Sequence, residues 1–111
     1  MNGKPRFLNS DERRWTDLGN GSRRRVLAFT DALMQVEVAF DEGAIGALHS
    51  HPHVQSSYVA EGRFEVTIDG ETRVLGTGGS FIVEPHLVHG VKALEAGRLI
   101  DCFTPKRDDF L

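Results

Sequence analysis

Residues 43–62 read GAIGALHSHPHVQSSYVAEG, and this stretch decides both the predicted fold and the predicted chemistry. His49 and His51 are two positions apart, so their side chains share one face of a β-strand predicted over residues 46–51. Imidazole is the commonest protein ligand for transition metals. Taken alone, the pair is explained equally well by a metal site and by two ordinary hydrogen-bonded histidines. Pro52 removes a backbone donor, which predicts that the strand ends there and that Gln55 begins the returning strand.

Two further residues complete a predicted donor set for a metal ion. Gln55 can turn its amide oxygen toward the two imidazoles, and His89 supplies a third imidazole from the start of a later strand. We therefore predict that His49, His51, Gln55 and His89 bind one divalent transition metal ion per chain. Three nitrogens and one oxygen suit Ni, Mn, Fe or Zn and leave positions open for water or substrate.

The two remaining histidines are expected outside this donor set. His53 has the same parity as His49 and His51, but the turn at Pro52 should swing it away, either to support a ligand from behind or to face solvent. His86 lies in a predicted loop and is expected to be exposed.

The length and composition limit the class of protein. A chain of 111 residues predicts one domain, with a lead-in over residues 1–20, a barrel over 21–104 and a tail over 105–111. The net charge of −3 argues against nucleic acid as a partner. No apolar run approaches the roughly 20 residues of a membrane span, so no membrane partner is expected. Cys102 is the single cysteine, which excludes an internal disulfide and predicts a cytoplasmic location.

Short alternating segments separated by turn signals indicate an all-β fold. Met34, Val36, Val38 and Phe40 alternate with more polar neighbours, as in a half-buried strand. Asp69-Gly70 is the strongest hairpin signal, because both residue types tolerate positive φ. Eight to ten such strands without a convincing helix predict a sandwich or barrel, of which the jelly roll is one form.

Three consecutive arginines enter one of these strands. Arg23 and Arg25 should share one face of the strand, while Arg24 takes the opposite face. Charged residues often blunt an exposed strand edge, which is the simpler interpretation. The alternative interpretation places one arginine at the mouth of a pocket, facing an anionic substrate.

The histidine-bearing stretch resembles the first sequence motif of the cupins, with Gly43, His49, His51 and Gly62 in place and Gln55 where the motif has glutamate. Residues 79–89 resemble the second motif through Gly79, Pro85 and His89, although Leu87 stands where glycine is frequent and the asparagine after the histidine is absent. The resemblance implies a cupin jelly roll, that is, a double-stranded β-helix barrel. Replacing glutamate with Gln55 removes one negative charge from the implied metal site.

The C-terminal run LIDCFTPKRDDFL is similar to the ending of the small cupins of pectin and alginate breakdown. That family ketonises 4,5-unsaturated uronates, so the resemblance implies a small-molecule sugar acid as the partner. It implies proton transfer by Asp101, binding of the substrate carboxylate by Arg107, and packing of Phe103 against the sugar ring. Without the resemblance, Asp101 would be a surface acid at a strand end and Arg107 part of an ion pair in the tail.

Two other function classes remain open at this point. Many cupins are metal-dependent dioxygenases, although Gln55 in place of glutamate counts modestly against that activity here. A non-catalytic sugar- or ligand-binding module is the second alternative. A homodimer is expected in each case, because a small jelly roll leaves an apolar sheet face and edge strands to cover.

Overall fold

The computed structural model describes residues 5–111, so the first four residues of the predicted lead-in lie outside the described residues. The all-β prediction is confirmed: this range forms ten strands and two 3-10 turns, Ser10–Glu12 and Asp108–Phe110. Within the same range, no helix has the length and apolar character that crossing a membrane requires.

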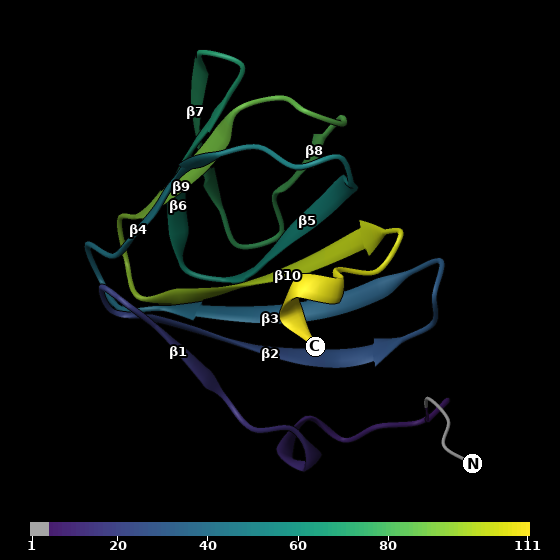
Figure 1. The fold of residues 1–111 in the computed structure, drawn as a ribbon. Helices are drawn as coiled ribbons and strands as arrows, with labels where there is room; N and C mark the ends of the chain where they lie inside the picture. The colour runs from purple at the N-terminus through teal and green to yellow at the C-terminus, as the bar shows by residue number, and fades with distance from the viewer. Residues whose placement is uncertain (1–4) are drawn as a thin grey trace.

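The strands form two sheets that face each other (Figure 1). The larger sheet has the order β1-β2-β3-β10-β5-β8 and the smaller one the order β4-β9-β6-β7, with all neighbours antiparallel. The larger sheet consists of β1 (Thr16–Gly19), β2 (Ser22–Phe29), β3 (Met34–Phe40), β10 (Gly97–Thr104), β5 (Val54–Glu61) and β8 (Ser80–Val83). The smaller sheet consists of β4 (Ile45–His49), β9 (His89–Ala93), β6 (Arg63–Ile68) and β7 (Glu71–Gly76).

The apolar core fills the space between the two sheets. Its largest cluster includes Val59 and Leu99 from the larger sheet and Phe64 from the smaller one. The Phe40 and Phe64 rings meet edge to face, with their centroids 5.2 Å apart. The alternation read from the sequence thus turns one face of each strand toward this core.

The strand that carries the first histidine is shorter than predicted. β4 ends at His49, so the prediction of one strand over residues 46–51 is wrong at its C-terminal end. His49 is the last residue of β4 to pair with β9, and Pro52 prevents the ladder from resuming before β5 begins at Val54. His51 therefore lies in the connection between the two sheets.

The turn signals are reproduced with one shift. Asp69 and Gly70 both have positive φ, 49° and 82°, and join β6 to β7 as the predicted hairpin. In the loop before β9 the positive φ that favours glycine belongs to His86, at 69°, one residue before Leu87. His86 is exposed, as expected.

Candidate metal centre and active site

The structure brings three of the predicted donors together between the sheets. Possible ligand atoms of His49, His51 and His89 all lie within 4.8 Å of one another. His49 and His89 are paired across β4 and β9, and their ring centroids are 4.3 Å apart. His51 reaches the same point from the connection, with its ring 4.8 Å from that of His89. His51 and His89 are buried, whereas His49 is exposed.

Backbone carbonyls fix the orientation of all three imidazoles. The Nδ1 atoms of His49, His51 and His89 lie 2.8, 3.1 and 2.9 Å from the carbonyl oxygens of Ala47, His53 and Leu87. A carbonyl oxygen only accepts hydrogen bonds, so each Nδ1 must carry the proton and donate. Each Nε2 is then left with a free lone pair, the tautomer in which histidine binds a metal ion.

The amide oxygen of Gln55 completes the predicted donor set. Gln55 Oε1 lies 3.0 Å from His51 Nε2 and 3.2 Å from His89 Nε2. With both Nδ1 atoms protonated, these contacts bring lone pairs together without a hydrogen between them. A cation among the three atoms would remove this repulsion, so the residues present fit a metal ion with mixed nitrogen and oxygen ligands.

Burial keeps two of these imidazoles ready to act as ligands. It lowers the pKa of both His51 and His89 below the usual value, because the charged form loses its hydration. For His51, the nearby amide oxygen of Gln55 acts in the opposite direction, because it favours the protonated ring, and it is the second largest influence on the pKa. Neutral imidazole is the form that coordinates a metal ion, so burial favours binding.

A chain of hydrogen bonds connects this donor set to a buried carboxylate. Gln55 Nε2 donates to Ser57 Oγ over 3.0 Å, and Ser57 Oγ donates to Asp101 Oδ1 over 2.6 Å. Burial raises the pKa of Asp101 to about 6, while the Ser57 hydrogen bond and the charge of Arg107 act to lower it. A carboxyl group with this pKa can take up and release protons near neutral pH.

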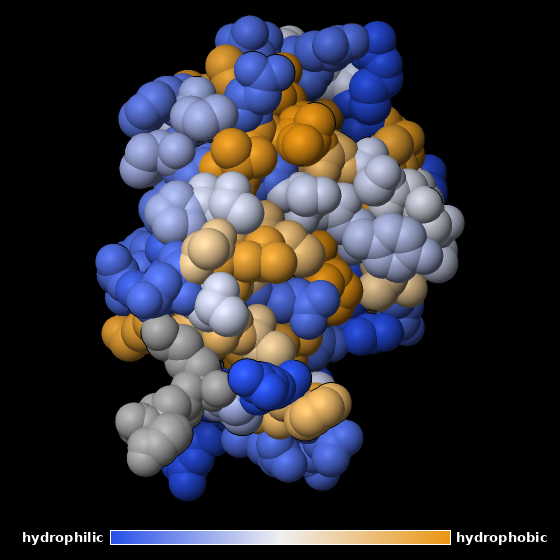
Figure 2. Space-filling model, turned by 90° about the vertical axis from the view of Figure 1, so that its right-hand side faces the viewer, coloured by the Kyte–Doolittle hydropathy of each residue, from blue (hydrophilic) through white to orange (hydrophobic). Residues whose placement is uncertain are grey.

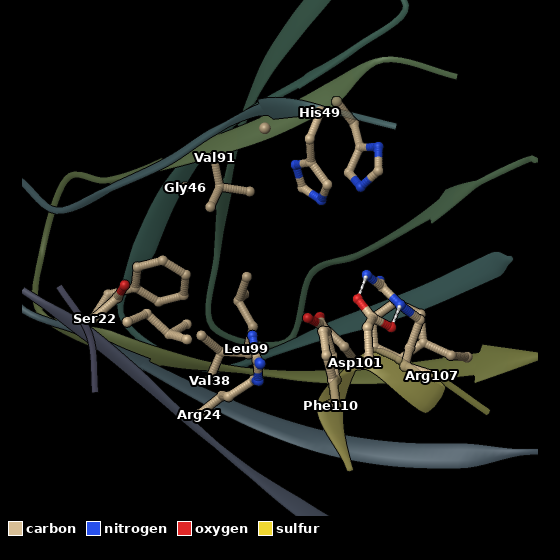
Figure 3. Close-up of a pocket in the computed structure, with 16 residues that line it drawn as sticks. Ser22, Arg24, Val38, Gly46, His49, Val91, Leu99, Asp101, Arg107 and Phe110 are labelled. Atoms are coloured by element: carbon tan, nitrogen blue, oxygen red, sulfur yellow. Dashed lines mark hydrogen bonds and ion pairs between the residues drawn. The ribbon is translucent and has the colours of Figure 1, made fainter. Parts of the chain in front are cut away.

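Of these groups, His49, His89 and Asp101 line one cavity of about 330 Å³ between the sheets, which lies in the range of small-ligand sites. Figure 3 shows His49 on one wall of the cavity and Asp101 with Arg107 on the other. The Phe103 ring also lines the cavity and is 97% hidden from solvent, with its centroid 5.7 Å from that of His51. Asp101 and Phe103, two positions apart on β10, thus both face the interior, and Asp101 is not the surface acid that the sequence without the resemblance would suggest.

Arg107 lies at this cavity but is already engaged. Its Nε and Nη2 donate to the two carboxylate oxygens of Asp109 over 3.0 and 2.8 Å. Its guanidinium carbon also lies 5.0 Å from the centre of the Phe103 ring and 4.3 Å from that of Phe110. The C-terminal 3-10 turn, Asp108–Phe110, therefore holds this arginine against the aromatic wall of the cavity.

His53 lies beside the donor set but not within it. Its ring centroid is 5.5 Å from that of His51 and 6.3 Å from that of Phe103. His53 is half-buried, and its backbone carbonyl accepts the hydrogen bond from His51 Nδ1. Of the two positions expected for His53, beside a ligand or facing solvent, the structure shows the first, because the His53 carbonyl contacts the ring of His51.

Two residues of the site, Ser57 and Phe110, were not singled out by the sequence patterns. Ser57 shares strand parity with Gln55, and this parity is the signal that could have placed it beside the metal donors. Phe110 lies within the quoted C-terminal run, but no pattern assigned it a place at the site. Arg24 lies on the inner face of β2 and lines the cavity, as one of the two interpretations of the arginine run required.

Comparison with known proteins shows the family. The sequence model described as "Cupin domain" matches residues 36–103, a range that includes all four predicted metal ligands as well as Asp101 and Phe103. The chain belongs to the cupin family.

Close relatives cover nearly all of this cupin. It is 48% identical to the pectin degradation protein KdgF of Dickeya dadantii over 96% of the chain and 98% of the relative. An RmlC-like cupin from Shewanella frigidimarina is 43% identical, with a TM-score of 0.94 over the whole of both chains. KdgF from a Halomonas species is 43% identical, with a TM-score of 0.91 over 96% of this chain and 99% of that one. The predicted resemblance to the small cupins of pectin breakdown is thereby confirmed.

Proposed function

We propose that this cupin ketonises 4,5-unsaturated uronates, the monosaccharides released when pectin or alginate is cut by lyases. The observation that carries the proposal is the Gln55–Ser57–Asp101 hydrogen-bond chain, which couples the metal-donor set to a buried carboxylate facing the same cavity. The similarity to two proteins named KdgF over nearly the whole chain supports the same activity.

The reaction is an isomerisation that needs only proton transfer. A base takes the proton of the C1 hydroxyl, the C1–O5 bond breaks, and an aldehyde at C1 and an enolate at C5 result. A proton delivered to C4 then converts the enolate to the C5 ketone. The overall composition does not change, so neither oxidant nor reductant is required.

We assign the proton transfers to Asp101, because its carboxyl group is buried at the cavity with a pKa raised to about 6. Phe103 offers an apolar surface for the sugar ring, and Arg107 brings positive charge close to the substrate carboxylate. His49, His51, Gln55 and His89 would hold one divalent transition metal ion per chain, with Ni, Mn, Fe and Zn as candidates. When bound, such an ion supplies positive charge that polarises a substrate oxygen.

The test follows the ultraviolet absorbance of 4,5-unsaturated galacturonate with metal-loaded protein, with chelated protein, and with Asp101→Asn. We expect the absorbance to fall faster than the spontaneous rate only with the loaded wild type, and to do so without oxygen. A loaded protein that leaves the spontaneous rate unchanged would overturn the proposed function. Activity that disappears under anaerobic conditions would instead indicate the oxygenase alternative. Elemental analysis of the purified protein would give the metal and its stoichiometry.

We further propose that the protein works as a homodimer in the cytoplasm. Tyr58 and Ile82 are half exposed or more on the outer face of the six-stranded sheet, and the edge strand β1 is exposed throughout. Figure 2 shows apolar groups at the surface among polar ones on the face that it presents. A second copy covering the outer sheet face and pairing through β1 would bury such surface. Light scattering during size-exclusion chromatography should give twice the chain mass of 12.3 kDa.

A further inference from the structure

The arginine run of β2 divides between two environments. Arg23 and Arg25 lie on the outer face, where their guanidinium carbons are 4.9 and 4.0 Å from the centre of the Trp15 ring. Arg25 also donates to Glu37 over 2.7 Å. Arg24 points the other way and lines the cavity that His49 and His89 also line. Because side chains alternate along a strand, only Arg24 of the three adjacent arginines faces the interior.

Arg24, unlike Arg25, is not held by a carboxylate in the described part of the chain. Among residues 5–111 its guanidinium makes no hydrogen bond or ion pair, and its guanidinium carbon lies 3.8 Å from the centre of the Phe110 ring. Burial is the largest influence on its pKa and lowers it below the usual value, while the charge of Asp109 acts in the opposite direction. A partly buried guanidinium with free donors on the wall of a cavity is a site for an anion.

We propose that Arg24 binds the carboxylate of the uronate substrate. This inference rests on the proposed function and refines it, because the assignment of the carboxylate to Arg107 meets an obstacle in the structure. Two donor atoms of Arg107 are already committed to the carboxylate of Asp109. Arg24 presents its whole planar fork without displacing an existing ion pair, and that fork matches the two oxygens of a carboxylate.

The position of Arg24 also suits the chemistry of the substrate. Arg24 pairs with Val38, and Val38 pairs with Leu99, two residues before Asp101 on the same face of β10. Figure 3 shows Arg24 and Asp101 on one wall of the cavity, with His49 on the other. In an unsaturated uronate the carboxylate is attached to C5, one end of the reacting double bond. Holding that carboxylate at Arg24 therefore fixes the double bond relative to Asp101 and the donor set.

The experiment compares Arg24→Gln with Arg23→Gln, which removes the same charge from the outer face of the same strand. Loaded proteins are assayed on 4,5-unsaturated galacturonate and on its methyl ester, which lacks the carboxylate charge. Binding of saturated galacturonate, which cannot react, is measured by calorimetry. We expect Arg24→Gln to raise KM about 10- to 100-fold and to weaken galacturonate binding similarly, with a smaller effect on kcat. Arg23→Gln should leave these values unchanged.

The methyl ester separates recognition of the carboxylate from a general disturbance of the cavity. The wild type and Arg23→Gln should prefer the acid to the ester, whereas Arg24→Gln should lose this preference and Arg24→Lys should keep part of it. Thermal midpoints of all variants are measured alongside. A loss of activity on both substrates in equal proportion, or an unchanged preference in Arg24→Gln, would overturn the proposal.

The same data distinguish failure of the inference from failure of the proposed function. If the wild type ketonises the uronate and Arg24→Gln matches it in KM, the inference fails while the function stands. If the wild type binds galacturonate without turning over the unsaturated sugar, the function fails. In that case weaker galacturonate binding by Arg24→Gln would still support Arg24 as the carboxylate site. Absence of both binding and turnover in the wild type would overturn both proposals.

Discussion

At the scale of single residues, Gln55 connects the histidines of the proposed metal site to Asp101, the residue to which we assign proton transfer. Its oxygen faces two imidazoles, while its nitrogen donates a hydrogen bond to Ser57, which in turn donates one to Asp101. An amide performs both tasks because it is an acceptor at one end and a donor at the other. The glutamate of the general motif offers no donor when ionised, so Ser57 would then stand between two carboxylates.

Gln55→Glu should therefore lower the turnover rate and raise the affinity for the metal ion. The added negative charge strengthens metal binding. An ionised glutamate side chain at position 55 has no N–H group, so the Ser57 hydroxyl loses the hydrogen bond that it accepts from residue 55 while it donates to Asp101. We expect turnover to fall at least about tenfold, while competition with a chelator shows tighter metal binding. Ser57→Ala is the matched control and should lower turnover without raising metal affinity. A fully active Gln55→Glu variant would contradict the role of the amide.

Burial gives Asp101 a pH-dependent effect on stability. Its pKa is raised from 3.8 to about 6, so the folded chain holds this proton more tightly than the unfolded chain. Below about pH 4 both states are protonated and no difference exists. As the pH rises through 6 the folded state bears a buried charge, and its stability falls relative to that at pH 4.

Asp101→Asn should remove this fall in stability with rising pH, because asparagine does not ionise. In metal-free protein we expect the variant and the wild type to unfold alike near pH 4, with the variant more stable at pH 8 by on the order of 3 kcal/mol. Urea unfolding across this pH range measures the difference. A gap between the two proteins that stays constant with pH would show that Asp101 does not titrate as described.

At the scale of elements, the start of β10 depends on a glycine in close contact with β5. A Cβ at Gly97 would lie 2.1 Å from the carbonyl oxygen of Glu61, far inside contact distance. The pairing of β10 with β5 is irregular directly after this point, between Arg98 and Leu99. The register that brings Asp101 opposite Ser57 begins at this contact.

Gly97→Ala should consequently destabilise the protein strongly. We expect a thermal midpoint lower by about 10 °C or more, because the backbone of two adjacent strands has to separate. Gly76→Ala is the control, since a Cβ at Gly76 meets nothing within 4 Å. Circular dichroism of both variants measures the effect, and equal midpoints would show that β5 and β10 can move apart without cost.

Strand alternation made most elements and several site residues predictable from the sequence. Asp101, Phe103 and Gln55 face the interior because parity along a paired strand leaves no other choice. The end of the histidine-bearing strand was not predictable in the same way. β4 stops when its ladder with β9 stops, and that depends on a partner forty residues away in the chain.

Ion pairs between neighbouring strands could not be predicted from the sequence pattern either. Glu37 alternates with apolar residues as an exposed acid would, yet it is only 3% exposed, because Arg25 and Arg98 of the neighbouring strands both donate to it. The ion pair between Arg107 and Asp109 depends in the same way on the fold of the last residues. Partners of this kind become visible only once the strand order is known.

At the scale of the whole molecule, the predicted ligands come from both sheets. His49 and His89 belong to the smaller sheet, Gln55 to the larger one, and His51 to the connection between them. An ion held by all four would tie the two layers together, and it would bind the folded chain far better than the unfolded one. Chelation should therefore lower the thermal midpoint, in addition to abolishing activity.

The separation of these ligands along the chain has a kinetic consequence. His49 and His89 meet only when β4 pairs with β9, so complete metal binding has to wait until nearly all of the chain is in place. An interaction that forms after the folding transition state slows unfolding and leaves the folding rate unchanged. In stopped-flow experiments, added metal should move only the unfolding limb of the chevron. The ion would then set how long the folded molecule lasts, and the bare chain would set how fast it folds.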